Sequence, residues 1–180
     1  MKRRLTFYTT VLMAAAIAGT AFADATADAI ASAESAGPQL VATGATIYGF
    51  GADGQMVVLR KGTNAYWRMP DDPSTPTADP MCGDANAMDW VMAWMGKTEP
   101  TKGKVGLIYM MAGGSDASNT DPFATAKTND NNWVTTGPHV MIMNATDMMA
   151  GYPTDPNPDT SMPYVMYAGT PYAHLMVPIQ

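Results

Sequence analysis

The run VGLIYMM at residues 105–111 is apolar along its length, with Lys104 before it and Gly113-Gly114 shortly after it. A short run that is apolar on both faces is typical of a strand buried in the middle of a sheet. Six further strand-like runs lie elsewhere in the chain, at residues 45–48, 56–59, 65–69, 140–143, 164–167 and 174–177. Together they predict a sheet of about five to seven strands around residues 105–111.

The connections between these runs favour antiparallel pairing. Residues 51–54, Gly-Ala-Asp-Gly, separate the first two runs, and a Gly/Asp turn between two strand-like runs predicts a hairpin. A second turn at residues 62–64 could extend this hairpin into a meander that includes residues 65–69. The Pro- and Asp-rich stretches at 70–80 and 152–161 have no apolar period, so we expect surface loops there.

One main helix is predicted, over residues 84–95, with a possible helical turn at residues 146–149. Asp84 stands near its start, where negative charge suits the helix dipole, and Gly96 follows its end. Its apolar residues recur at helical spacing and are Met88, Val91, Met92 and Met95. The predicted fold class is therefore α+β, with an antiparallel sheet that carries this helix on one face. A β-sandwich or a small barrel with one helix is the alternative.

The N-terminus has the pattern of a cleavable export signal. Lys2, Arg3 and Arg4 precede an apolar stretch at residues 5–18, and Ala21-Phe22-Ala23 supplies the small residues that a signal peptidase recognises. We expect residues 1–23 to be removed, residues 24–36 to form an Ala-rich leader, and residues 37–180 to form a single globular domain. The expected location is periplasmic or secreted, with no membrane span after cleavage.

The charge of the chain argues against two classes of partner. Loss of Lys2, Arg3 and Arg4 with the signal leaves seven basic residues against sixteen acidic ones. Nucleic acids and anionic membrane surfaces are bound by clustered basic side chains, and here the basic residues are scattered. We therefore expect no nucleic-acid partner.

Cys82 is the only cysteine of the sequence, so no disulfide can form within one chain. In an oxidising compartment an unpaired thiol is buried and inert, joined to a second chain in a disulfide-linked dimer, or bound to a metal. Cys82 also comes just before the predicted helix, where the helix dipole favours a thiolate. A thiol enzyme that uses Cys82 with a histidine is therefore a further alternative.

The two histidines of the chain stand in similar surroundings. His139 lies in Gly-Pro-His-Val-Met at 137–141, and His174 lies in Pro-Tyr-Ala-His-Leu-Met at 171–176. On a strand, residues two apart share a face, so each imidazole would lie beside a thioether, that of Met141 or Met176. Imidazole and thioether donors suit copper, and the sequence contains 17 methionines. The predicted metal ligands are His139, His174, Met141, Met176 and Cys82. The alternative is that the methionines are core residues and the histidines are structural.

A second candidate site follows the central strand, within a polar stretch of about 20 residues at 113–132. Ser115 or Ser118 could act as a nucleophile with one of the histidines, oriented by Asp116 or Asp121. The Gly-x-Ser-x-Gly motif of the α/β-hydrolases is incomplete here, because Ala117 replaces its second glycine. The same loop could bind Ca²⁺, although it lacks the regular acidic spacing of a calcium loop, or it could be a purely structural surface loop.

The segments GGSDASNTDP at 113–122 and TPYAHLMVP at 170–178 carry a resemblance that extends over about residues 79–179. In this region the chain resembles a type of short exported bacterial protein of unassigned function. The resemblance implies an independent exported domain, and it implies no activity, cofactor or catalytic residue.

The predicted function is that of an exported soluble binding protein, whose site lies where His139 and His174 meet the loop at 113–122. A soft transition metal, copper first, is the expected ligand. A small secreted serine hydrolase is the alternative, and a structural or interaction domain is the third possibility.

Overall fold

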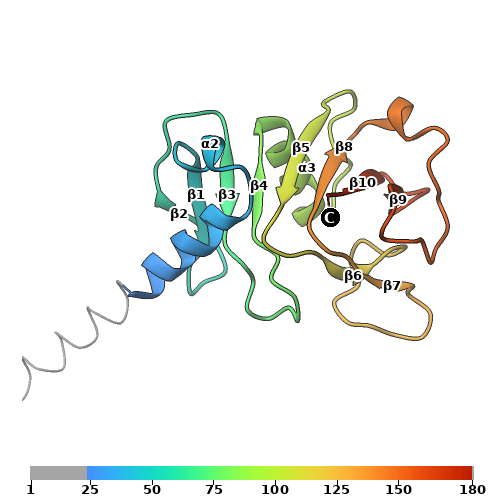
Figure 1. Cartoon of the computed structure of the whole chain (residues 1–180), viewed down its shortest axis with the longest axis horizontal. Coiled ribbons are helices and arrows are strands. Elements are labelled where there is room, and N and C mark those ends of the chain that lie inside the picture. Colours follow the sequence, from blue (N-terminus) through green and yellow to red (C-terminus); the bar gives the residue numbers. More distant parts are fainter. Residues whose placement is uncertain (1–23, 180) are drawn as a thin grey trace, which may run out of the picture.

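The computed structural model describes residues 24–179 and shows an eight-stranded sheet in the order β2-β1-β3-β4-β5-β8-β10-β9 (Figure 1). The eight strands are β1 (Thr46–Phe50), β2 (Met56–Arg60), β3 (Trp67–Met69), β4 (Met81–Gly83), β5 (Gly106–Met110), β8 (His139–Met143), β9 (Tyr164–Met166) and β10 (His174–Pro178). The helical elements are residues 24–35, α2 (Gln39–Ala42), α3 (Ala85–Met95) and the 3-10 turn η1 (Thr146–Met149). The predicted α+β class is confirmed, and the sheet has more strands than the expected five to seven. The export signal predicted over residues 1–23 lies outside the described residues.

Several strands are too short to be recognised from periodicity. β4 has three residues and lies between β3 and β5, near the middle of the sheet. A separate two-stranded sheet, β6 (Asp116–Ser118) with β7 (Trp133–Thr135), forms within and just after the stretch expected to be an irregular loop. A segment of three residues is too short to show a clear alternation of apolar and polar positions. These segments are extended because they pair with neighbouring strands.

The predicted meander is wrong in one respect. β1 and β2 form the expected antiparallel hairpin, but β3 pairs with β1 in parallel, on the side opposite β2. The chain between β2 and β3 therefore crosses from one side of β1 to the other. At Gly62 it lies so close to the backbone of Ala45 and Thr46 that a Cβ atom would overlap them. The other neighbouring strands of the sheet are antiparallel.

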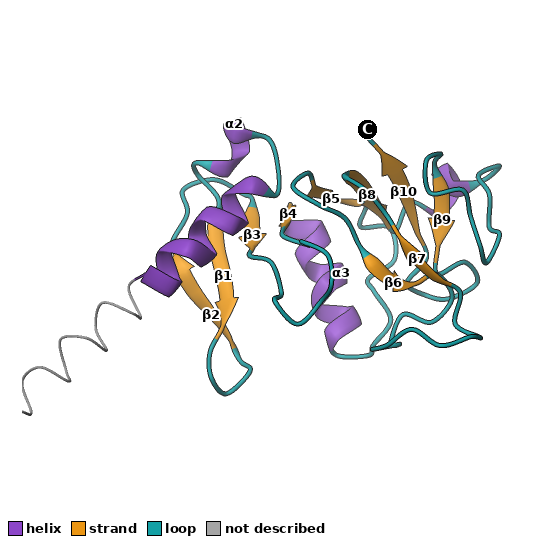
Figure 2. Cartoon of the chain, turned by 60° about the horizontal axis from the view of Figure 1, so that its bottom comes forward, coloured by secondary structure: helices purple, strands orange, loops and turns teal. Residues whose placement is uncertain are grey.

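Helix α3 begins and ends as predicted. The Asp84 carboxylate accepts a hydrogen bond from the Ala87 N–H at 2.8 Å, and Gly96 follows the last helical residue. The buried face differs from the predicted stripe, because Ala87, Trp90 and Val91 are buried whereas Met92 and Met95 are exposed. The helix packs against β5, and Figure 2 shows it beside β4 and β5.

The helix at residues 24–35 is fastened to the sheet by a buried arginine. Arg68 on β3 is fully buried, and its Nη1 donates to the carbonyl oxygens of Ala33 and Glu34 at 2.8 and 2.9 Å. These carbonyls belong to the last turn of the helix, where backbone acceptors lack partners within the helix and positive charge suits the dipole. Burial lowers the pKa of the guanidinium, although its charge is favoured by the Glu34 carboxylate.

We expect Arg68→Ala to lower the free energy of unfolding by about 3 kcal/mol, because buried carbonyls would lose charged hydrogen bonds. Arg60→Ala is the matched control, since Arg60 also contacts Glu34, through a half-exposed ion pair of 2.6 Å. That pair should contribute less than about 1 kcal/mol. Urea unfolding followed by tryptophan fluorescence measures both values. Equal losses in the two variants would contradict the role of Arg68.

Candidate metal centre

The strands that carry the two histidines are neighbours in the sheet. β8 and β10 are antiparallel, with His174 opposite Met143 and His139 opposite Pro178. Directly opposed residues share a face, so both imidazoles lie on the same buried side of the sheet. They are offset by four residues, which is about 13 Å along a strand. The register therefore places the two histidines toward opposite ends of the strand pair rather than side by side.

Each histidine has its own methionine neighbours. His174 lies between Met143 on β8 and Met166 on β9, and Met176 follows two residues later on the same face. All three methionines are almost completely buried. Directly opposed Cβ atoms are typically about 4.5–5.5 Å apart, which lets flexible thioether side chains reach a common point.

His139 is surrounded in a similar way by different residues. Met110 on β5 stands directly opposite it, and Met141 follows two residues later on β8. Met141 and Met176 oppose each other in the middle of the strand pair, so they separate the two histidines. The alternation of residues along β5, β8, β9 and β10 could have identified Met110 and Met166 from the sequence, had the strand order been known.

Both imidazole rings are held by the same hydrogen bond. Nδ1 of His139 lies 2.8 Å from the carbonyl oxygen of Gly137, and Nδ1 of His174 lies 2.9 Å from that of Tyr172. A carbonyl only accepts, so each Nδ1 carries the proton and each Nε2 keeps its lone pair. Both Nε2 atoms are buried and have no hydrogen-bond partner among residues 24–179. Metal-binding histidines commonly show this arrangement, in which the second ring nitrogen donates to a carbonyl.

Burial keeps both rings neutral. Burial lowers the pKa of His139, and it lowers the pKa of His174 to about 4, against the opposing effect of the hydrogen bond to Tyr172. A positive charge on His139 would lower the pKa of His174 further. Neutral imidazole is the form that binds metal ions, so neither ring needs to lose a proton near neutral pH.

Aromatic rings and a strained turn cover His174. The rings of Trp90 and Tyr167 each lie edge-on to it, with centroids 5.4 Å away. Tyr167 has a φ of 56°, a left-handed conformation that is costly for a bulky residue, and its N–H donates to the Asn119 carbonyl at 2.9 Å. Such strain persists where the surrounding structure holds it, often at functional sites.

Cys82 cannot join the predicted ligand set in this structure. It lies opposite Arg68 and Tyr109 in the sheet, on the face away from Ile108 and the histidines. The thiol is completely buried, and burial raises its pKa despite the nearby Arg68 charge. The described residues hold no group of three or more His, Cys, Asp and Glu side chains suited to a metal.

The four residues predicted for a hydrolase have structural partners instead. Ser118 donates to the Asn131 carbonyl and accepts from the N–H groups of Thr120 and Asp121. Asp116 accepts from Trp133 Nε1, and Asp121 accepts from the Phe123 N–H. Ser115 Oγ contacts Met110 Sδ at 3.7 Å. Within residues 24–179, none of these four side chains is hydrogen-bonded to a histidine ring.

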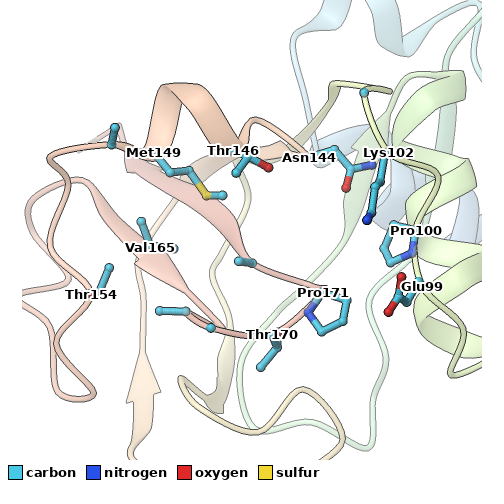
Figure 3. Close-up of a pocket in the computed structure, with 15 residues that line it drawn as sticks. Glu99, Pro100, Lys102, Asn144, Thr146, Met149, Thr154, Val165, Thr170 and Pro171 are labelled. Atoms are coloured by element: carbon cyan, nitrogen blue, oxygen red, sulfur yellow. The ribbon is translucent and has the colours of Figure 1, made fainter.

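A pocket that sequence reasoning missed lies on the face of the sheet opposite His139 and His174. Its volume is about 690 Å³, and Val165 and Ala173 line it (Figure 3). Val165 precedes Met166 and Ala173 precedes His174, and successive residues of a strand point to opposite faces. The pocket is therefore on the face of β9 and β10 opposite Met166 and His174. Its other walls come from residues 99–103, 144–154 and 168–171. Glu99 and Lys102 stand on one wall.

Comparison with protein-family models, with curated proteins and with solved structures finds no match to this chain. None of the helices in the described part of the chain has the length and apolar character needed to cross a membrane.

Burial of Cys82 predicts that the folded protein resists thiol reagents. A maleimide should label the native protein only as fast as it opens, and it should label the urea-unfolded protein at once. Mass spectrometry of the labelled protein gives the extent at each time. Rapid labelling under native conditions, or a disulfide-linked dimer in native protein, would contradict the position of Cys82.

The depressed pKa of His174 predicts a loss of stability in acid. The unfolded chain takes up this proton near pH 6.5 and the folded chain only near 4, so stability is complete above 6.5 and declines below it. Between pH 7 and 4 the wild type should lose about 3 kcal/mol more than His174→Gln. Urea unfolding at several pH values measures the difference. Parallel pH profiles in the two proteins would exclude this effect.

Proposed function

We propose that the protein binds a soft monovalent cation, Cu(I) first, through His174, Met143, Met166 and Met176. One observation carries the proposal. The Nε2 lone pair of His174 is buried without a partner among residues 24–179, on a ring fixed by Tyr172, with methionines on both sides of it. An unpaired buried polar atom is costly, and a bound ion would satisfy it.

The chemistry of the donors supports a soft ion of low charge. Thioethers and imidazole are ligands of Cu(I), whereas hard ions require carboxylate or carbonyl oxygens. The four donors are uncharged, so the charge of a bound ion would remain unneutralised in a buried site. A monovalent ion is then less costly to bury than Zn²⁺ or Cu²⁺. The ring of Trp90 lies 5.4 Å from that of His174, and the face of an indole ring attracts cations.

Access to this centre requires local opening, because His174 is only 2% exposed. The turn between β9 and β10 carries both Tyr167 and Tyr172, which cover and hold the imidazole. The Tyr167 N–H, whose residue has the strained φ, donates a hydrogen bond to the Asn119 carbonyl, and the strain that this contact helps to hold would be released when the turn opens. The export signal predicted over residues 1–23 would place this binding function outside the cytoplasm.

The test is an anaerobic titration with Cu(I) against a coloured competing chelator. His174→Gln should weaken the tightest binding about 100-fold or more, since loss even of outer partners costs 10- to 100-fold. Met166→Leu, which keeps the apolar volume and removes the sulfur, should weaken it at least about tenfold. Met162→Leu is the matched control, because Met162 is 58% exposed and is not one of the proposed donors. It should bind as the wild type does.

Ag(I) provides a second readout that does not depend on the oxidation state of copper, and Zn²⁺ should compete poorly with either ion. Near-UV circular dichroism checks that each variant is folded. The proposal fails if the wild type does not bind Cu(I), or if folded His174→Gln binds it with unchanged affinity. In that event a structural or interaction role would account for the methionines.

A further inference from the structure

We infer that a second soft-cation centre lies on the same face of the sheet, formed by His139, Met110 and Met141. This inference rests on the proposed function, because it assigns the same chemistry to a second set of donors. It replaces the expectation that both histidines hold one ion.

The two donor sets share no residue. The register pairs His139 with Met110 on β5, and it pairs His174 with Met143 on β8 and Met166 on β9. The offset of about 13 Å along the strands is too long for two imidazoles to reach one ion while they stand upright on the sheet. Each histidine therefore has to use the methionines beside it.

His139 is prepared for an ion in the same way as His174. It is 1% exposed, its Nδ1 lies 2.8 Å from the Gly137 carbonyl, and its Nε2 is buried without a partner among the described residues. A charged or hydrogen-bonding ligand at Nε2 would satisfy this atom.

Two residues that flank β6 and β7, Ser115 and Thr136, contact the donors of this centre. Thr136 Oγ1 accepts from the Ser115 N–H at 2.7 Å and lies 3.4 Å from Nδ1 of His139. Ser115 Oγ lies 3.7 Å from the sulfur of Met110, the residue opposite His139. Ser115, in the polar stretch after the central strand, thus contacts one donor, and Thr136 contacts the ring that carries the other. These contacts would hold the two donors in place, and Ser115 would not act as a nucleophile.

Two bound cations at these centres would repel each other. The donors of both sites are uncharged, Met141 and Met176 stand directly opposite each other where the two sites meet, and no ion pair in residues 24–179 includes a histidine. At an effective dielectric constant of about 20, two unit charges no more than about 13 Å apart should weaken the second binding step at least about tenfold. The second ion should therefore bind with lower affinity than the first.

Native mass spectrometry of the full folded domain, titrated with Ag(I) and with Cu(I), counts the bound ions. The wild type should bind two ions, His139→Gln one, His174→Gln one, and the double variant none. Met110→Leu is a second variant with conserved volume, and it should weaken only one of the two ions. Met111→Leu is its matched control, because Met111 is the next residue and is 38% exposed.

The outcomes separate this inference from the proposed function. One ion in the wild type, lost in His174→Gln and kept in His139→Gln, overturns the second centre and leaves the first. One ion that is lost in either single variant shows a shared site, which overturns the inference. Two ions that persist in His139→Gln also overturn it. No bound ion in the wild type overturns the inference together with the proposed function.

Discussion

The register of four neighbouring strands, β5, β8, β10 and β9, is the constraint on which the candidate centre depends. Antiparallel pairing places directly opposed residues on one face, and this face carries both histidines with Met110, Met141, Met143, Met166 and Met176. A shift of one residue in any of these pairs would turn its histidine or methionines to the other side. Along β5 and β8 burial specifies this register, because the residues of the histidine-bearing face are buried there and the alternate residues are only half-buried.

The other half of the sheet is stabilised by a different kind of interaction. Arg68 ties β3 to the last turn of the helix at residues 24–35, and Cys82 lies beside it on β4. The helix at residues 24–35 and α3 thus lie on opposite faces of the sheet (Figure 1). This arrangement keeps the thiol away from the histidines, since alternate residues of β4 face opposite layers. It also makes the Ala-rich stretch before residue 37 part of the packed structure.

Local patterns predicted the elements whose own residues carry a strong signal. The helix after Asp84, the β1–β2 hairpin and the strand at Gly106–Met110 all appear, because capping, a Gly/Asp turn and an apolar run act over short distances. The three-residue strands β4, β6 and β7 were missed, and so was the parallel pairing of β1 with β3. The exposed Met92 and Met95 show a further limit, since apolar spacing alone cannot distinguish which of two adjacent stripes a helix buries.

The sequence by itself determined that two His-x-Met segments lie on strands and that the chain is rich in soft donors. Only the tertiary structure decided which donors meet, because strand order and register depend on contacts between segments far apart in the chain. It placed His139 beside Met110 and His174 between Met143 and Met166, and it put Cys82 on the far side of the sheet. Hydrogen bonding of both Nδ1 atoms to backbone carbonyls, which leaves both Nε2 atoms without a partner in the part of the chain that the structure describes, likewise required the folded backbone.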